Sequence, residues 1–466
     1  MSTAENETIE QAPVTTNRKQ PFPRGFLDTI STGWAERPES LPAARAQAAF
    51  AAVRRARVSE AFAGKRVVIE AGSFKQRSND TDYPFRAHSA FAHLTGWAAD
   101  AEPDSVLVFK PTDAGHDVTL YFRERADRTT TEFYADSTVG EFWIGPRPSL
   151  ADVAADLAIA TDHLAVFAAT DKDVTLADTD LETFVSELRL IKDEYEIAEM
   201  RRAVEITARG FDDIIQALPD AAQHSRGERV VEGVFHRRAR EDGNGEGYDT
   251  IAASGPHACY LHWTRNDGSV IPGDLILVDA GVEADSLYTA DITRTLPVNG
   301  TFSDVQRRVY NAVLEAADAA FAAARPGVRF REVHEAAMAV IAKRTAEWGV
   351  LPVTAEEALD ADAGGQHRRY MVHGTSHHLG IDVHDCAQAR REMYYDGILE
   401  AGMVFTIEPG LYFQIDDLTV PEELRGIGVR IEDDILMTEE GPVNLSADIP
   451  RTAEDVEAWI AEGRTV

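Results

Sequence analysis

The pattern of apolar and polar residues predicts mixed helices and strands in the first part of the chain. Apolar side chains recur at helical spacing across an alanine-rich stretch at residues 41–62, which predicts an amphipathic helix. Short runs rich in β-branched residues at 66–70, 105–109 and 118–122 predict strands. This mixture predicts an α/β unit of roughly 160 residues.

Helices are also predicted in the second part of the chain. A long helix is predicted to begin within residues 192–200, where apolar side chains return at helical spacing. Another should begin at Ser303, because Ser303 and Gln306 form a capping-box pattern, and should end at residues 326–327. A third should follow and end at residues 348–349. Apolar runs between these helices predict strands.

The length of the chain favours two domains. With 466 residues, it exceeds what one hydrophobic core usually serves, and 44% hydrophobic content is enough for two cores. We expect a disordered or extended tail over residues 1–24, an N-terminal α/β domain over 25–189 and a C-terminal domain over 190–466. The first twenty residues are polar and lack the apolar core of a signal peptide, and no later run predicts a membrane span.

Net charge and cysteine content indicate which partners and which cell compartment to expect. A formal net charge of −33 argues against nucleic acid and anionic membranes as partners. Two cysteines, Cys259 and Cys386, make no disulfide framework and fit a cytoplasmic protein. We expect both to be buried as small apolar residues. A redox-sensitive thiol is the minor alternative.

Two aspartates lie in a predicted hairpin. Asp279 closes the apolar run at residues 275–278, and Asp291 follows a polar turn. A hairpin centred near Asp285 would set the two aspartates opposite each other. Charge inside strand-like segments is costly unless something compensates it. A bound cation would do so, although capping of a turn is the ordinary role of Asp beside Gly.

A second hairpin repeats this construction. Glu408 and Glu432 are symmetric about a loop near Val420. His377, in the imidazole-rich run at residues 373–385, would be a fifth ligand. Four carboxylates with one imidazole favour Mn²⁺, Co²⁺, Fe²⁺ or Zn²⁺ over Mg²⁺. Two such ions roughly 3.5–4 Å apart can share a hydroxide, lower its pKa toward about 7 and polarise a carbonyl, which is the chemistry of amide hydrolysis.

Two other motifs in the imidazole-rich run are weaker evidence for a catalytic site. His373 and His377 are four residues apart and could imitate a helical zinc pair, but no His-Glu-x-x-His string is present and Gly374 disfavours a helix. Ser376 lacks the Gly-x-Ser-x-Gly pattern of a serine hydrolase.

From about residue 26 to 445, the chain resembles the Xaa-Pro aminopeptidases (aminopeptidase P), in the metallopeptidase family that also holds prolidase and methionine aminopeptidase. The resemblance implies an α/β, creatinase-like N-terminal domain followed by an α+β pita-bread catalytic domain with a curved antiparallel sheet. It rests on separate segments in a fixed order: RSNDTDYPFR (77–86), LRLIK (188–192), LHWT (261–264), VDAG (278–281), the run at 373–385, IEPG (407–410) and RIED (430–433).

The resemblance implies two divalent metal ions, with Mn²⁺ expected first and Co²⁺, Zn²⁺ or Fe²⁺ left open. Asp291 and Glu432 would bridge the ions, and Glu408 would also act as the general base that takes a proton from the attacking water. The implied ligands are Asp279, Asp291, His377, Glu408 and Glu432.

Further roles follow from the same resemblance. His262 and His384 are implied to contact substrate and to stabilise charge on the scissile carbonyl. His373 would lie nearer the proline pocket, and Arg430 would orient the metal-binding carboxylates. We expect the adjacent Asp385 to fix the tautomer of His384.

The resemblance also implies roles for Asp80 and Trp143, by analogy with the tetramers that members of the family form. There, the segment matching Asp80 and an aromatic residue matching Trp143 approach a neighbour's active site. A homo-oligomer, dimer or tetramer, is therefore implied.

The implied activity is that of a proline-specific aminopeptidase, a hydrolase that releases the N-terminal residue from peptides with proline second. An alternative is a prolidase restricted to Xaa-Pro dipeptides. A non-catalytic pita-bread binding protein and a metal-free creatinase-like hydrolase remain further alternatives. The complete ligand set argues against both, because a buried carboxylate cluster without cations would repel itself.

Overall fold

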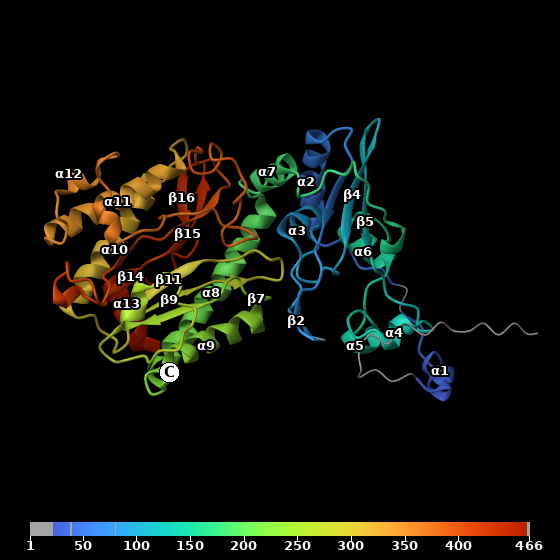
Figure 1. The fold of residues 1–466 in the computed structure, drawn as a ribbon, viewed down its shortest axis with the longest axis horizontal. Coiled ribbons are helices and arrows are strands. Elements are labelled where there is room, and N and C mark those ends of the chain that lie inside the picture. Colours follow the sequence, from blue (N-terminus) through green and yellow to red (C-terminus); the bar gives the residue numbers. More distant parts are fainter. Residues whose placement is uncertain (1–21, 38–39, 80, 464–466) are drawn as a thin grey trace, which may run out of the picture.

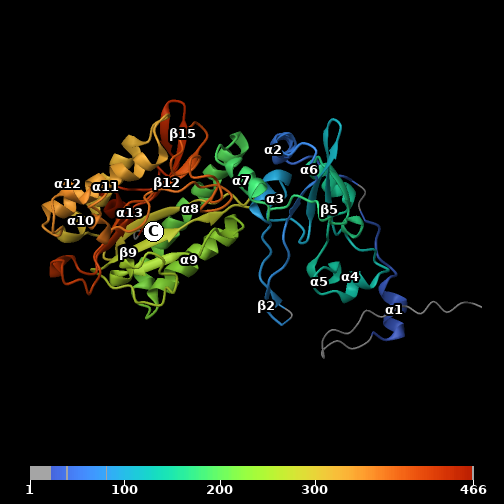
Figure 2. The same ribbon diagram turned by 45° about the horizontal axis from the view of Figure 1, so that its top comes forward.

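Two hydrophobic cores organise the chain. A computed structural model describes residues 22–37, 40–79 and 81–463. One core gathers buried side chains between Val58 and Leu188, and the other gathers them between Ala203 and Ile460. The two parts lie side by side, with α7 (Thr179–Glu187) next to the connection between them (Figures 1 and 2). The expected tail falls outside the described residues as far as residue 21.

The N-terminal part is built on a four-stranded sheet in the order β1-β4-β5-β6, in which only the β5–β6 pair is parallel. The three predicted strands are confirmed as β1, β4 and β5, and the predicted first helix is confirmed as α2 except at residues 41–46, which are not helical. The strands are β1 (Val67–Glu70), β4 (Val106–Thr112), β5 (Gly115–Phe122) and β6 (Ala160–His163), and the principal helices besides α7 are α2 (Gln47–Ala61), α3 (Ser89–Thr95) and α6 (Leu150–Leu157).

Shorter elements extend from this sheet. The hairpin of β2 and β3 projects from it, and three short helices lie on the side away from the C-terminal part (Figure 1). These elements are β2 (Gln76–Ser78), β3 (Thr81–Asp82), α1 (Arg24–Ile30), α4 (Thr131–Ala135) and α5 (Glu141–Ile144).

In the C-terminal part, two helix pairs cover the strands. The predicted capping box at Ser303 and Gln306 is confirmed, and Asp193 with Glu196 forms another at the start of α8. The predicted helix ends are confirmed to within a few residues. The helices are α8 (Glu194–Ala221), α9 (Gly227–Asp242), α10 (Asp304–Ala323), α11 (Phe330–Glu347), α12 (Ala355–Ala358) and α13 (Ala453–Gly463).

Antiparallel strands make the inner face of this part, in the ladders β11-β9-β8, β12-β15-β16, β13-β14 and β10-β7. The curved antiparallel arrangement with outer helices is the expected pita-bread fold (Figure 1). The strands are β7 (Gly245–Glu246), β8 (Ile251–Ser254), β9 (Leu275–Ala280), β10 (Val282–Glu283), β11 (Ile292–Pro297), β12 (Val404–Ile407), β13 (Gly410–Tyr412), β14 (Gly428–Arg430), β15 (Asp433–Thr438) and β16 (Gly441–Asn444).

The register of the first hairpin differs from the prediction. Asp279 pairs with Thr293, not with Asp291. Because Asp291 lies two residues before Thr293, the two aspartates are diagonal neighbours on one face of the ladder. The turn is thus displaced slightly from Asp285, but both carboxylates still face the same side.

The second hairpin has the predicted symmetry. Ile407 pairs with Asp433 in β12–β15, and Gly410 pairs with Arg430 in β13–β14, so both pairings are centred on residue 420. Glu408 and Glu432 therefore fall opposite each other in the break between these ladders. The backbone N–H of Glu432 donates to the carbonyl of Thr293 over 3.1 Å, which joins the two hairpins.

No helix in the described ranges is long and apolar enough to cross a bilayer.

Candidate metal centre and active site

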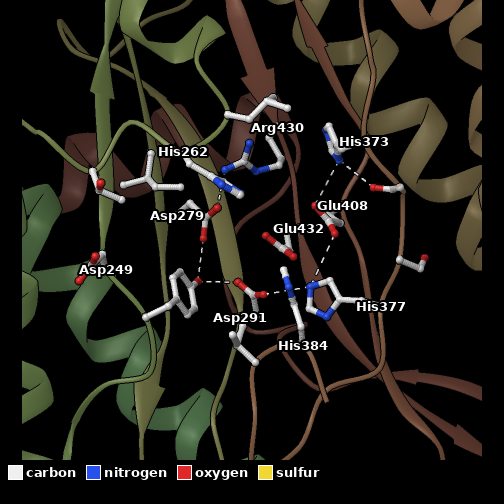
Figure 3. A pocket seen from close by; sticks show the side chains of 17 residues that line it. Asp249, His262, Asp279, Asp291, His373, His377, His384, Glu408, Arg430 and Glu432 are labelled. Atoms are coloured by element: carbon white, nitrogen blue, oxygen red, sulfur yellow. Dashed lines mark hydrogen bonds and ion pairs between the residues drawn. The ribbon is translucent and has the colours of Figure 1, made fainter. Parts of the chain in front are cut away.

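A cavity of about 690 Å³ lies on the inner face of the strands (Figure 3). All five predicted metal ligands line it, and the two hairpins plus the segment after residue 373 deliver them. The ligands are Asp279, Asp291, His377, Glu408 and Glu432.

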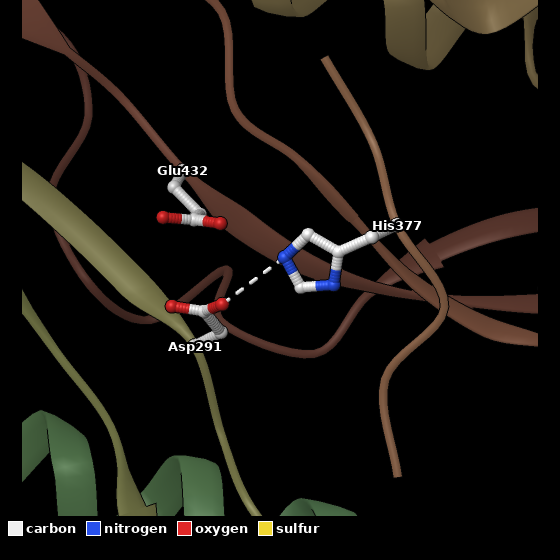
Figure 4. Close-up of side chains that lie close together, drawn as sticks. All are labelled: Asp291, His377 and Glu432. Atoms are coloured by element: carbon white, nitrogen blue, oxygen red, sulfur yellow. Dashed lines mark ion pairs between the residues drawn. The ribbon is translucent and has the colours of Figure 1, made fainter. Parts of the chain in front are cut away.

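Three of these residues form the tightest group. One ligand atom from each of Asp291, His377 and Glu432 lies within 4.8 Å of the others (Figure 4). His377 Nε2 is 3.2 Å from the Asp291 carboxylate and 3.6 Å from that of Glu408. Its Nδ1 lies 3.2 Å from the carbonyl oxygen of His378, which can only accept a hydrogen bond. One proton therefore belongs on Nδ1, which leaves Nε2 as the nitrogen that would bind a cation.

The segment that carries His377 is extended and does not form a helix. The N–H of Thr406 donates to the carbonyl of His377, and that of Glu408 donates to the carbonyl of Thr375. This segment thus runs beside β12, which excludes the helical pairing of His373 with His377.

The carboxylates repel one another in the protein alone. Burial raises the pKa of Glu432 well above its usual range, and the charges of Asp291, Glu408 and Asp279 raise it further. Burial likewise raises the pKa of Glu408 to about 7. Burial lowers the pKa of His377, but Asp291 and Glu408 outweigh it and bring the value to about 9. Divalent cations would remove this repulsion, so the donor set fits metal ions.

Arg430 connects the aspartate cluster to the far wall of the cavity. Its guanidinium donates to the Asp279 carboxylate, to Thr293 Oγ1 over 3.1 Å and to the Tyr412 hydroxyl oxygen over 3.1 Å. That hydroxyl is in turn 2.8 Å from His373 Nε2. Arg430 therefore contacts one predicted ligand directly and reaches His373 through Tyr412.

Tyr248 is a site residue that the sequence reasoning missed. Its hydroxyl is 2.7 Å from the Asp279 carboxylate and also contacts that of Asp291. Burial raises its pKa well above the usual range, and both aspartates add to the effect, so the hydroxyl keeps its proton. A tyrosine outside any ligand pattern gives no sequence signal of such a role.

His262 lies on a loop that one buried carboxylate holds. The fully buried side chain of Glu228 accepts from the backbone N–H groups of Ser254 and Gly268 over 2.9 and 2.6 Å. It also contacts His257 Nδ1 at 2.7 Å and accepts from Trp263 Nε1 over 2.9 Å, so both of its oxygens are committed to the loop. His262 lines the cavity.

His384 lies beside the metal-ligand cluster, with its ring centroid 4.3 Å from that of His377. The expectation that Asp385 fixes its tautomer is wrong. The fully buried Asp385 is 2.8 Å from Arg189 Nε and 3.3 Å from Lys192 Nζ. Its carboxylate is therefore paired with these two cations and not with His384. Burial, and then the charge of His377, lower the pKa of His384, so the ring is neutral.

Of the two predicted substrate contacts Asp80 and Trp143, the structure describes Trp143 alone, and Trp143 is not among the cavity residues. Trp143 lies on α5, with an exposed ring whose Nε1 donates to the carbonyl of Tyr134 over 2.8 Å. In Figures 1 and 2, α5 lies below the sheet of the N-terminal part, apart from the C-terminal part. Asp80 lies outside the described residues.

Both cysteines are buried thiols. Burial raises the pKa of Cys259 to about 12, and burial followed by the charge of Asp385 raises the pKa of Cys386 above its usual range. We therefore expect native protein to resist thiol reagents at pH 8, and both cysteines to react after unfolding. Counting modified thiols by mass spectrometry checks this. Rapid modification of native protein with loss of activity would instead support the redox alternative.

Comparison with known proteins agrees with this geometry. The profile of Metallopeptidase family M24 matches residues 198–439, and that of Aminopeptidase P, N-terminal domain, matches residues 51–175. Xaa-Pro aminopeptidase 1 of Streptomyces coelicolor is 48% identical over 98% of each chain. Xaa-Pro aminopeptidase of Escherichia coli is 33% identical over 88% of this chain and 97% of its own.

Solved structures give the same result. A glutamate-to-alanine variant of Escherichia coli aminopeptidase P in complex with substrate superimposes with a TM-score of 0.76 at 31% identity, covering 91% of this chain and all of that one. The relatives do not favour the prolidase alternative, and they support an enzyme over the non-catalytic binding protein. The family implies divalent metal ions and peptide substrates. The chain therefore belongs to metallopeptidase family M24, as a metal-dependent exopeptidase of the aminopeptidase P group.

Proposed function

We propose that this protein releases the N-terminal residue from peptides whose second residue is proline. The observation that carries the proposal is the convergence of five metal-ligand side chains and two flanking histidines, His262 and His384, on one cavity. Proline-specific relatives with nearly the same length support the substrate class.

Two divalent ions would be held by Asp279, Asp291, His377, Glu408 and Glu432. When bound, such ions supply a water of lowered pKa and polarise the scissile carbonyl. We propose Mn²⁺ as the natural ion, although a relative has been solved as Zn-substituted aminopeptidase P in complex with product, and the donor set accepts both metals.

The protein's own residues would then carry the proton and orient the substrate. Glu408 lies between His373 and His377, at 3.5 and 3.6 Å, and is placed to take the proton of the attacking water. His262 and His384 line the same cavity and would donate to the carbonyl oxygen as negative charge develops there.

Proline specificity would come from a shaped pocket. An Xaa-Pro bond has no amide N–H, so recognition through an extended backbone is unavailable. His373 and Arg430 line the cavity and are joined through the hydroxyl of the buried Tyr412, and these two side chains would hold the proline ring. We further propose a cytoplasmic homo-oligomer, in which Asp80 and the exposed Trp143 approach a neighbour's cavity.

The test is hydrolysis of Lys-Pro-Pro and Ala-Pro by purified protein, after EDTA treatment and after Mn²⁺ is restored. Cleavage of the tripeptide that EDTA abolishes and Mn²⁺ restores is the expected result. Cleavage of the dipeptide alone would replace the proposal with prolidase activity. Ala-Ala-Pro, with proline in third place, is the matched control and should not be cleaved.

A further inference from the structure

The loop of residues 380–386, which carries His384 and is called the His384 loop below, is held by the N-terminal domain and by the connection between the two domains. It contains neither helix nor strand, and its Cys386 has a left-handed backbone with φ of 59°. Such a backbone is unfavourable for a residue with a side chain, so surrounding contacts must fix it. The N–H of Cys386 donates to the Asp385 carboxylate over 2.9 Å, which places Asp385 at the centre of this restraint.

The connection between the two domains supplies the cations for Asp385. Arg189 Nε donates to Asp385 over 2.8 Å, and Lys192 Nζ lies 3.3 Å from its other oxygen. All three side chains are buried, and Lys192 also donates to the carbonyl of Arg189 over 2.6 Å. Burial favours the neutral acid, yet Arg189 and Lys192 lower the pKa of Asp385 to about 2. This buried group therefore stays charged, and removing one partner leaves charge uncompensated.

The N-terminal domain holds the other end of the same loop. Arg86 donates to the carbonyl of Ile381 over 2.7 Å and to Glu283 over 2.6 Å. Ser89, at the start of α3, donates to the Asp382 carboxylate over 2.5 Å. Contacts at Ile381, Asp382 and Asp385 thus surround the position of His384.

Close packing leaves the His384 loop little room to shift. A Cβ added at Gly380 would lie 2.2 Å from the Asp385 carboxylate and 3.0 Å from Lys192 Cε. Gly380 therefore permits the close approach of the loop to Lys192. A tightly packed loop with buried ionic contacts is suited to holding a catalytic side chain in one position.

We propose that Arg86, Arg189 and Lys192 are positioning residues, through which the N-terminal domain and the interdomain connection hold His384 against the metal centre. The inference rests on the role of His384 in the proposed function. It makes the N-terminal domain part of the catalytic assembly of its own chain, because a displacement of His384 would weaken its contact with the transition state.

The test is a double-mutant cycle with two positioning variants, Lys192→Met and Arg86→Met, each made in the natural chain and with His384→Ala. Tripeptide hydrolysis, bound metal and the melting temperature are measured for every variant. In the natural background, each variant should lower kcat about 10- to 100-fold, with KM and metal content little changed. With His384→Ala, neither variant should lower kcat further.

Arg238→Met is the matched control, because Arg238 also joins two elements through carboxylates, those of Asp213 and Asp242, but lies on α9. It should leave kcat unchanged in both backgrounds. If Lys192→Met fails to fold, Arg86→Met still tests the proposal, because the Arg86 side chain is partly exposed and its replacement should disturb folding less.

Equal loss of kcat in both backgrounds would overturn the inference while leaving the proposed function intact, as would full kcat in both positioning variants. Full activity of His384→Ala alone would remove the proposed role of His384, and the positioning role with it.

Discussion

Replacement of Asp291 by alanine should abolish peptide hydrolysis and reduce the bound metal from two ions to fewer than one per chain. Asp291 shares the tightest ligand group with His377 and Glu432, and it is proposed to bridge both ions. Removing a bridging carboxylate takes a ligand from each site at once, so neither site would keep its coordination number. Metal content by plasma mass spectrometry, measured with hydrolysis at saturating Mn²⁺, checks the prediction.

Two companion variants separate metal binding from folding. Asp291→Asn keeps the shape of the side chain and an oxygen for the Tyr248 hydroxyl, but it should also lose both ions because the bridging charge is gone. Asp249→Asn is the matched control, since Asp249 is an exposed acid that lines the same cavity outside the ligand group. It should keep both ions. Two ions retained in Asp291→Ala would show that Asp291 is not the bridge.

The convergence of the four proposed carboxylate ligands was accessible from sequence because each pair lies on a local hairpin. Strand alternation puts residues two apart on one face, so Asp279 and Asp291 face the same cavity although the predicted register was shifted. The symmetry of Glu408 and Glu432 about residue 420 survives even though the ladder breaks between them. The two strands of a hairpin are close together in the sequence, so their apolar and polar pattern and the turn between them can be read from the sequence alone.

Contacts between distant segments were not accessible in this way. Asp385 was assigned to its neighbour His384, but Arg189 and Lys192, almost 200 positions earlier, take its charge. Tyr248 reaches two aspartates from the coil before β8, and nothing in its local pattern marks it. The first pairing arises only when the connection between the domains packs against the loop that carries Asp385, and the second only when the coil before β8 packs against the β9–β11 hairpin.

Replacement of His384 by alanine should lower kcat about 10²- to 10³-fold while leaving both metal ions in place. The ring lies beside His377 and lines the cavity, but it is not part of the ligand group. Its proposed contact is with the carbonyl oxygen in the transition state, and the loss of one such donor typically costs this much. Steady-state hydrolysis of Lys-Pro-Pro, together with metal analysis of the same sample, checks both parts.

The division between kcat and KM identifies the cause. A donor that acts mainly in the transition state lowers kcat and kcat/KM together, whereas a contact made equally with bound substrate raises KM alone. His236→Ala, which removes an exposed imidazole on α9, should change neither. Loss of metal from His384→Ala would make the residue a support of the ligand cluster, and unchanged kcat would leave His262 as the histidine available to stabilise the carbonyl oxygen.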